Sequence, residues 1–320
     1  MSGWRRLLEE ESEHQWLSFV VFSIIVIIGS ILIDWSSDLS GVQEGSSLGV
    51  QGLVIDSTED SVLYQSEDGN IINYKGQENL AQYATCLEEY RGMTLACLGT
   101  EGMVAFIGDG GPECDTEWCQ FSIGENLTAS QISGNGDALL FVVQDGTSDS
   151  LAAMWYGDSN PTPLVSEFDE TMYLDIIVPT YEGWLIGGSW QAPPNWLGSN
   201  PASPPKYELV IEAKWNGVGA PSIEVVHIGA EGAIHGLFET KDGYLATGTS
   251  DSYTITENSV ESLGISSQVA TDDNNGNVWL FGDIGSKTVA IVADEGITVE
   301  KLPEPLNIVP TYATCDEEGM

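Results

Sequence analysis

The feature that most limits what this chain can fold into is a strand–turn–strand unit that recurs along it. The best-formed copy is QVATDDNNGNVWLFGD, residues 268–283. Its Val, Trp and Phe residues suit a pleated, half-buried strand, and the Asp, Asn and Gly residues between them tolerate the positive φ of a tight turn. This pattern predicts two antiparallel strands joined by a polar turn.

Seven copies of the unit can be aligned on their turns, and the last of them begins at Ile308. The turn residues are Asp60, Gly102, Asp137, Gly183, Gly243, Gly276 and Gly319. The copies are spaced by roughly 40 residues, the length of four short strands with their turns. Further β-like runs such as YELVIEAKW and IEVVHIG follow the copies, and no sustained helical period follows residue 50. The sequence therefore predicts an all-β domain over residues 50–320.

Aligned in this way, residues 50–320 resemble the β-propeller repeat families, in the broad sense of kelch, sialidase-repeat and regulator propellers. The closest local match is Asp273–Trp279, which is similar to the D-x-x-G-x-V-W turn of propellers in sensor ectodomains. The resemblance implies a ring of six to seven four-stranded blades, and a pair of β-sandwiches is the competing fold. The seventh copy stops at its turn, which favours a truncated last blade or a ring closure with a different phase.

An apolar segment between Trp16 and Trp35 predicts a membrane-spanning helix over residues 17–34. No charged residue occurs from Leu17 to Ile33. At about 1.5 Å of rise per residue, this stretch and its aromatic flanks span most of a hydrocarbon core of about 30 Å. The two tryptophans occupy interfacial positions, and no small-x-small cleavage pattern follows them. An uncleaved signal anchor is therefore favoured over a cleaved signal peptide.

The basic residues around this segment predict its orientation in the cell membrane. Arg5 and Arg6 precede it, and the next basic residue is Lys75. The positive-inside rule then makes residues 1–16 a cytoplasmic segment and places the chain from residue 35 onward outside. Residues 35–49 are rich in Ser, Gly and Asp and are interpreted as a flexible stalk.

The chain carries 9 Lys plus Arg against 49 Asp plus Glu, a formal net charge of −40. This charge excludes nucleic acid and anionic lipid headgroups as partners. It indicates adaptation to salty surroundings, with cation binding as the alternative. No cofactor motif is present. Calcium binding is kept as a possibility because Asp272–Gly276 and Asp109–Glu113 are acidic turns. The EF-hand spacing, however, fails at Thr271 and Gly282. Turns without a bound ion are therefore the simpler interpretation.

The cysteines are compatible with disulfides, which an exterior location permits. Cys114 and Cys119 flank the acidic loop CDTEWC, and Cys86 and Cys97 are a second possible pair, with Cys315 left over. Connectivity does not follow from sequence alone. No zinc-ligand spacing is present, so structural disulfides are favoured over a metal site.

A proline-rich insertion in the fourth repeat, residues 190–206, reads WQAPPNWLGSNPASPPK. Prolines stiffen such a loop and keep it out of a sheet. Trp190 and Trp196 are binding-loop candidates because they can stack on a sugar or a partner. The alternative is that both rings pack over the edge of a blade.

The enzyme classes considered are poorly supported by the sequence. A site resembling that of sialidases needs several arginines, whereas the exterior part has only Arg91, and the G-x-S-x-G nucleophile elbow is absent. Two hypotheses remain. The first is an anchored extracytoplasmic module that binds or scaffolds a protein, glycan or cation. The second is an anchored carbohydrate-active hydrolase with a carboxylate pair near the channel. No catalytic residue or metal ligand is assigned.

Overall fold

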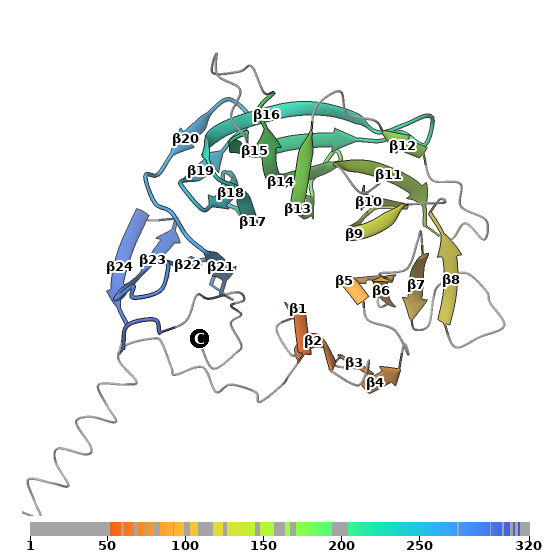
Figure 1. The fold of residues 1–320 in the computed structure, drawn as a ribbon, viewed down its shortest axis with the longest axis horizontal. Coiled ribbons are helices and arrows are strands. Elements are labelled where there is room, and N and C mark those ends of the chain that lie inside the picture. Colours follow the sequence, from red (N-terminus) through yellow and green to blue (C-terminus); the bar gives the residue numbers. More distant parts are fainter. Residues whose placement is uncertain are drawn as a thin grey trace, which may run out of the picture.

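Six four-stranded antiparallel sheets follow one another along the chain in the computed structural model (Figure 1). The predicted cytoplasmic segment, membrane helix and stalk lie outside the residues that the structure describes, and so does most of the seventh copy. Within the described part, no helix has the length and apolar character needed to cross a membrane. The described residues are 52–58, 61–66, 70–73, 76–79, 84–91, 93–98, 103–107, 118–123, 127–144, 148–156, 164–166, 171–193, 204–273, 275–294, 296–302, 304–307, 310 and 313.

The first three sheets in chain order are called blades 1, 2 and 3. Blade 1 contains β1 (Gly52–Thr58), β2 (Ser61–Ser66), β3 (Asn70–Asn73) and β4 (Gly76–Asn79). Blade 2 contains β5 (Ala84–Tyr90), β6 (Met93–Leu98), β7 (Met103–Ile107) and β8 (Trp118–Ser122). Blade 3 contains β9 (Thr128–Asn135), β10 (Ala138–Gln144), β11 (Asp149–Trp155) and β12 (Leu164–Ser166).

The remaining sheets are blades 4, 5 and 6. Blade 4 contains β13 (Met172–Pro179), β14 (Trp184–Gln191), β15 (Lys206–Lys214) and β16 (Ser222–Glu231). Blade 5 contains β17 (Ile234–Thr240), β18 (Gly243–Gly248), β19 (Ser252–Ile255) and β20 (Val260–Ser262). Blade 6 contains β21 (Val269–Asp272), β22 (Val278–Phe281), β23 (Thr288–Ala293) and β24 (Gly296–Lys301).

The blades are arranged radially around a central space. In Figure 1 the first strand of each blade faces this space and the fourth strand lies farthest from it. Consecutive first strands contact one another from β1 to β21. Strand order within every sheet is sequential, so each blade is a simple meander. This is a β-propeller-like arrangement, and it confirms the expectation of an all-β fold built from four-stranded units.

Apolar side chains on both faces of the middle blades are buried against neighbouring blades. In β10, Leu139 and Phe141 belong to a core cluster shared with blade 2, whereas Leu140 and Val142 belong to a cluster shared with blade 4. All four are fully buried. Successive side chains of a strand point to opposite faces. A strand packed on both sides therefore needs a continuous apolar run, which explains the sequence ALLFVV.

Buried carboxylates also join neighbouring blades. Glu208 of β15 is 0% exposed and accepts hydrogen bonds from the N–H groups of Ser250 (2.8 Å) and Asp251 (3.0 Å) in blade 5. The hydroxyl of Tyr253 donates to its other oxygen at 2.7 Å. Between blades 3 and 4, Asp149 accepts the N–H of Leu174. A buried carboxylate is tolerated only when donors satisfy it, so these bonds fix how adjacent blades dock.

The structure corrects the assignment of the second sequence repeat. MTLACLGTEGMVAFIGD was aligned as a first hairpin with its turn at Gly102, but its strands are β6 and β7, the middle pair of blade 2. The first hairpin of that blade pairs β5 with β6 and turns at Arg91, which has φ 52°. Both hairpins show the same apolar runs around a short polar turn, so the pattern alone does not tell which one comes first.

The two ends of the ring differ, and each has a defining feature. The end called the turn face carries the turns that join first to second strands, namely residues 136–137, 180–183, 241–242 and 275–277. At the opposite end, called the bulge face, first strands contain one extra residue relative to their partners, namely Ser130, Asp175 and His235. The same bulge occurs in β1 and β5. Bulges re-aim side chains and increase local twist, so this end of the ring can present irregular polar groups.

Candidate functional site

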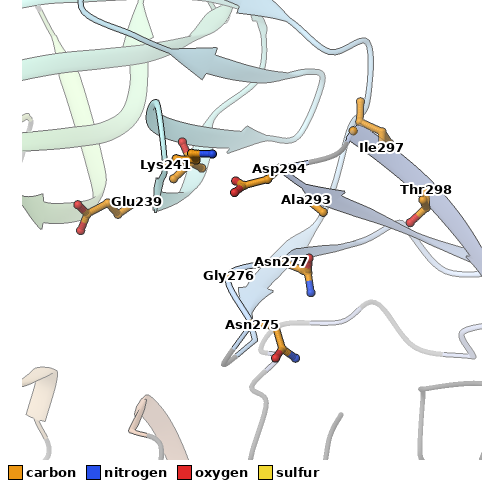
Figure 2. A pocket seen from close by; sticks show the side chains of 11 residues that line it. Glu239, Lys241, Asn275, Gly276, Asn277, Ala293, Asp294, Ile297 and Thr298 are labelled. Atoms are coloured by element: carbon orange, nitrogen blue, oxygen red, sulfur yellow. The ribbon is translucent and has the colours of Figure 1, made fainter.

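A polar cavity of about 580 Å³ opens on the turn face between blades 5 and 6. Its wall combines the turn of the first hairpin in blade 5 with two turns of blade 6 (Figure 2). In Figure 2 the Asp294 carboxylate points toward the turn that carries Lys241, and Asn275 and Asn277 lie on the neighbouring turn. The polar side chains that line the cavity are Glu239, Thr240, Lys241, Asn275, Asn277, Asp294 and Thr298.

Asp273 holds one wall of this cavity in shape. One of its carboxylate oxygens accepts the N–H groups of Asn275 and Asn277, both at 2.9 Å. The other accepts the Asn277 side-chain amide at 2.9 Å and the Trp279 indole N–H at 3.1 Å. Burial alone would raise the pKa of Asp273, but these hydrogen bonds outweigh it and keep the pKa below its ordinary value. Its oxygens therefore serve as acceptors for the turn itself.

The chemistry of the cavity suits recognition of a polar ligand. Carboxylates at Glu239 and Asp294 accept hydrogen bonds or meet a positive charge, and Lys241 and the amides of Asn275 and Asn277 supply donors. All of these side chains are at least partly exposed. A preformed concave site with a few convergent polar groups is the usual form of a small-ligand site.

A pair of acidic side chains lies at the bulge face where blades 3 and 4 meet. Asp149 begins β11 and is 3% exposed, and its carboxylate accepts the Leu174 N–H at 2.5 Å. Asp175 is the extra residue of the β13 bulge. Lys206 supplies the nearby positive charge, and its ammonium lies 3.3 Å from the centre of the Tyr173 ring.

Both carboxyl groups are shifted toward the protonated form. Desolvation raises the pKa of Asp149, against the hydrogen bonds from Leu174 and Gln144 and the charge of Lys206, which lower it. Asp175 is exposed to solvent as a residue, but the protein packed around its carboxyl group still partly desolvates that group. This desolvation, reinforced by the charge of Asp149, raises the pKa of Asp175 to about 6. The charge of Asp149 thus disfavours ionisation of Asp175, and a carboxyl group whose pKa is raised by burial and a like charge is a recognised feature of functional sites.

Trp190 does not lie on an exposed loop in the structure. It is the penultimate residue of β14, is 3% exposed, and packs against Tyr207 with ring centres 6.0 Å apart. The insertion leaves the sheet after Gln191, and the Ala192 N–H donates to the Pro205 carbonyl at its base. Trp196 lies outside the described residues, so its role as a binding-loop candidate stays a prediction.

One of the two expected disulfides is confirmed. Cys86 and Cys97 face each other on β5 and β6 and are bonded, with Cα atoms 5.0 Å apart. Cys114 lies outside the described residues, and Cys119 is described only as part of β8, so the second pairing stays a prediction. Within the described part of the chain, no group of three or more His, Cys, Asp or Glu side chains is placed to hold a metal ion.

Comparisons with known proteins give only distant structural likenesses. No protein-family model matches the sequence, and the search of curated proteins finds no match. The structure of apo AztD from Citrobacter koseri is similar with 12% identity and a TM-score of 0.43, over 79% of this chain and 82% of that chain. A structural genomics protein of unknown function from Bacteroides thetaiotaomicron has 11% identity and a TM-score of 0.34, over 74% and 65%. At these values neither likeness supports a functional assignment, and the propeller-like description stands on the sheet order.

Sequence reasoning missed the acidic pair and most of the cavity wall. Asp175 lies inside the apolar run MYLDIIVP, where a charged residue breaks the alternation expected of a buried strand. That break was the available signal for a bulge. Lys241 and Asp294 sit in ordinary polar turns, and nothing in their local sequence shows that blades 5 and 6 bring them together.

We predict that Asp175 makes the free energy of unfolding fall as pH rises from about 4 to about 6. Its folded-state pKa is about 6, whereas an unfolded aspartate titrates near 4. Between these values the folded chain binds more protons than the unfolded chain, so folding loses stability as protons leave. Asp175→Asn should therefore gain stability relative to the unchanged chain at pH 7 but not at pH 4, measured by urea unfolding at both pH values.

The exposed Glu257→Gln substitution is the matched control for removing one acidic charge. It should alter stability by the same small amount at pH 4 and pH 7. A difference between Asp175→Asn and the unchanged chain that is independent of pH would show that Asp175 titrates normally.

Proposed function

We propose that this chain is a membrane-anchored, extracytoplasmic β-propeller that works as a binding or scaffolding module and engages a protein, glycan or cation on its turn face. The observation that carries the proposal is the polar cavity between blades 5 and 6, whose wall comes from three turns held on two packed sheets. Loops positioned by a rigid scaffold are the usual carriers of binding function.

The charge of the chain restricts the ligand further. A net charge of −40 repels anions and attracts cationic or neutral polar groups. The cavity has the same bias, because the carboxylates of Glu239 and Asp294 accompany a single ammonium, that of Lys241. A ligand with amino, amide or hydroxyl groups fits this set, whereas a phosphate or sulfate does not.

Two observations support an exterior location. Residues 17–34 have the length, apolar character and aromatic flanks of a signal anchor. The Cys86–Cys97 disulfide belongs to an oxidising compartment. The acidic composition is in keeping with a surface exposed to high salt, where screening weakens self-repulsion.

The binding proposal predicts that removing the charged groups of the cavity weakens ligand binding. The full-length chain is titrated by calorimetry with calcium, neutral oligosaccharides and a lysine-rich peptide, at low and at high salt. For a probe that binds through both groups, Lys241→Ala combined with Asp294→Ala should raise the Kd about thirtyfold, because the two lost contacts cost on the order of 1 kcal/mol each.

Lys301→Ala combined with Glu304→Ala is the matched control, since it also removes one exposed cation and one exposed anion but lies outside the cavity. It should leave the Kd unchanged. Equal weakening by the two double variants would assign the effect to overall charge and would contradict a site at the cavity.

The proposed topology predicts which part of the chain external protease removes. On intact cells, added protease should digest residues 35–320 and leave the amino-terminal segment protected inside, as read with an amino-terminal tag and a carboxy-terminal tag. Loss of the amino-terminal tag in intact cells, or survival of both tags until lysis, would contradict the topology.

A second candidate function, an anchored carbohydrate-active hydrolase, is favoured by the Asp149–Asp175 pair. A carboxyl group with a pKa of about 6 is suited to act as a general acid near neutral pH. If the pair is catalytic, hydrolysis of neutral chromogenic glycosides should peak near pH 6 and be abolished by Asp175→Asn. The absence of hydrolysis by the unchanged chain between pH 4 and pH 8 would leave binding as the function.

A further inference from the structure

Two tryptophan rings lie together at the turn face where blades 3 and 4 meet. Trp155 ends β11 and is 42% exposed, and Trp215 directly follows β15. Their ring centres are 4.9 Å apart and the planes are tilted by 46°. The Trp215 indole N–H donates to the Gly219 carbonyl at 2.9 Å, which fixes the orientation of that ring. The pair presents a partly exposed aromatic surface in a defined geometry.

The loop that follows Trp215 is shaped around the ring of Trp155. Gly217 has φ 85°, and a Cβ atom at this position would lie 2.2 Å from a carbon of the Trp155 ring. Only glycine permits both the backbone conformation and the close approach. The Asn216 side chain accepts the Val218 N–H at 3.1 Å, which closes a local turn. The aromatic surface is therefore organised before any ligand arrives, which lowers the entropic cost of binding.

A cavity of about 270 Å³ adjoins this pair, with Trp215 in its wall. Lys214 contributes an ammonium that pairs with Glu182 at 2.9 Å and with Glu212 at 3.2 Å. The exposed side chains of Asn216 and Ser222 add an amide and a hydroxyl. Hydrogen-bond donors and acceptors thus lie along one side of the Trp215 ring. The ion pairs between Lys214 and the two glutamates hold the charged groups in a fixed orientation.

A sugar ring matches this combination of groups. Its axial C–H face packs on an indole ring, and its equatorial hydroxyls reach donors and acceptors at the rim. An apolar peptide would bury Lys214 and Glu182 without new partners, which is unfavourable. An anionic ligand is opposed by the net charge of −40. The chemistry therefore favours an uncharged, polyhydroxylated ligand.

We propose that Trp155, Trp215 and the loop 215–220 form a subsite that binds the sugar rings of a neutral oligosaccharide. This inference rests on the proposed binding function and names its ligand class. The subsite is separate from the cavity between blades 5 and 6, because the two cavities share no lining residue. Both open on the turn face.

The test uses the full-length chain in a phosphocholine detergent, because sugar-headed detergents would compete for the subsite. The probes are hexamers of β-1,4-linked glucose and of β-1,4-linked N-acetylglucosamine, with a hexamer of galacturonic acid as the anionic control. Calorimetry and tryptophan fluorescence should show saturable binding of a neutral hexamer and none of the acidic one. Trp155→Ala should raise the Kd of the neutral hexamer about tenfold or more, because it removes the exposed ring that packs beside Trp215.

A second variant tests the subsite in case Trp155→Ala does not fold correctly. Val218 is 79% exposed, so Val218→Glu places a charged side chain over the cavity without disturbing the core. It should also raise the Kd, with unchanged thermal unfolding. Val299→Ala, at a position 64% exposed on blade 6, is the control and should bind as the unchanged chain does.

The outcomes separate this subsite from the wider proposal. The subsite would be overturned if neutral hexamers bind Trp155→Ala and Val218→Glu with an unchanged Kd but bind Lys241→Ala with Asp294→Ala weakly. That result would leave the binding function in place. Stronger binding of the acidic hexamer would overturn the ligand class. If no neutral hexamer binds, the subsite is overturned. If calcium and the lysine-rich peptide do not bind either, the proposed binding function is overturned as well.

Discussion

The packing of each central blade against both of its neighbours is the constraint on which the rest of the structure depends. Alternate residues of β10 enter two different core clusters, so neither face of that strand can carry polar groups. Carboxylates that do enter the interfaces accept hydrogen bonds from the neighbouring blade: Glu208 of blade 4 accepts N–H groups of blade 5, and Asp149 of blade 3 accepts an N–H group of blade 4. The position of each blade against its neighbours is therefore set by apolar packing and by a few buried hydrogen bonds.

This constraint determines where function can reside. The sheet faces between central blades are occupied by packing, so side chains near the central space are free to meet a ligand at the two ends of the ring. The outer strands β16 and β24 expose further side chains along the rim. The turn face joins short loops from several blades, and it also carries turn-to-turn contacts such as the Asn135 amide bonded to the carbonyls of Thr180 and Gly183. The bulge face carries Asp175 and His235. In a regular strand each of these residues would pair with a residue of the second strand, but here each is the extra residue of a β-bulge. His235 is held by Ser267 of the next blade, and burial lowers its pKa.

The architecture could be predicted from the sequence, whereas the sites could not. Strands and turns are local, so the motif ending in Trp279 was recognised as a turn, and its Asp273 organises that turn through five hydrogen bonds. The first hairpin of blade 2 was misassigned because two hairpins of one blade have the same pattern. Trp190 was proposed for a loop because prolines follow it, but the strand continues to Gln191 before the insertion begins. The Trp155–Trp215 pair joins residues sixty positions apart, a contact that only the docking of blades 3 and 4 creates.

The most direct test of the account is the energetic coupling between Glu208 and Tyr253 across the interface of blades 4 and 5. A double-mutant cycle with Glu208→Gln and Tyr253→Phe, followed by urea unfolding, measures it. Because the two side chains share a buried hydrogen bond of 2.7 Å, the account predicts a coupling energy of about 0.5–3 kcal/mol. Effects that add to within about 0.3 kcal/mol would show that the two blades are not docked in this way, and the proposed sites at both ends of the ring would lose their scaffold.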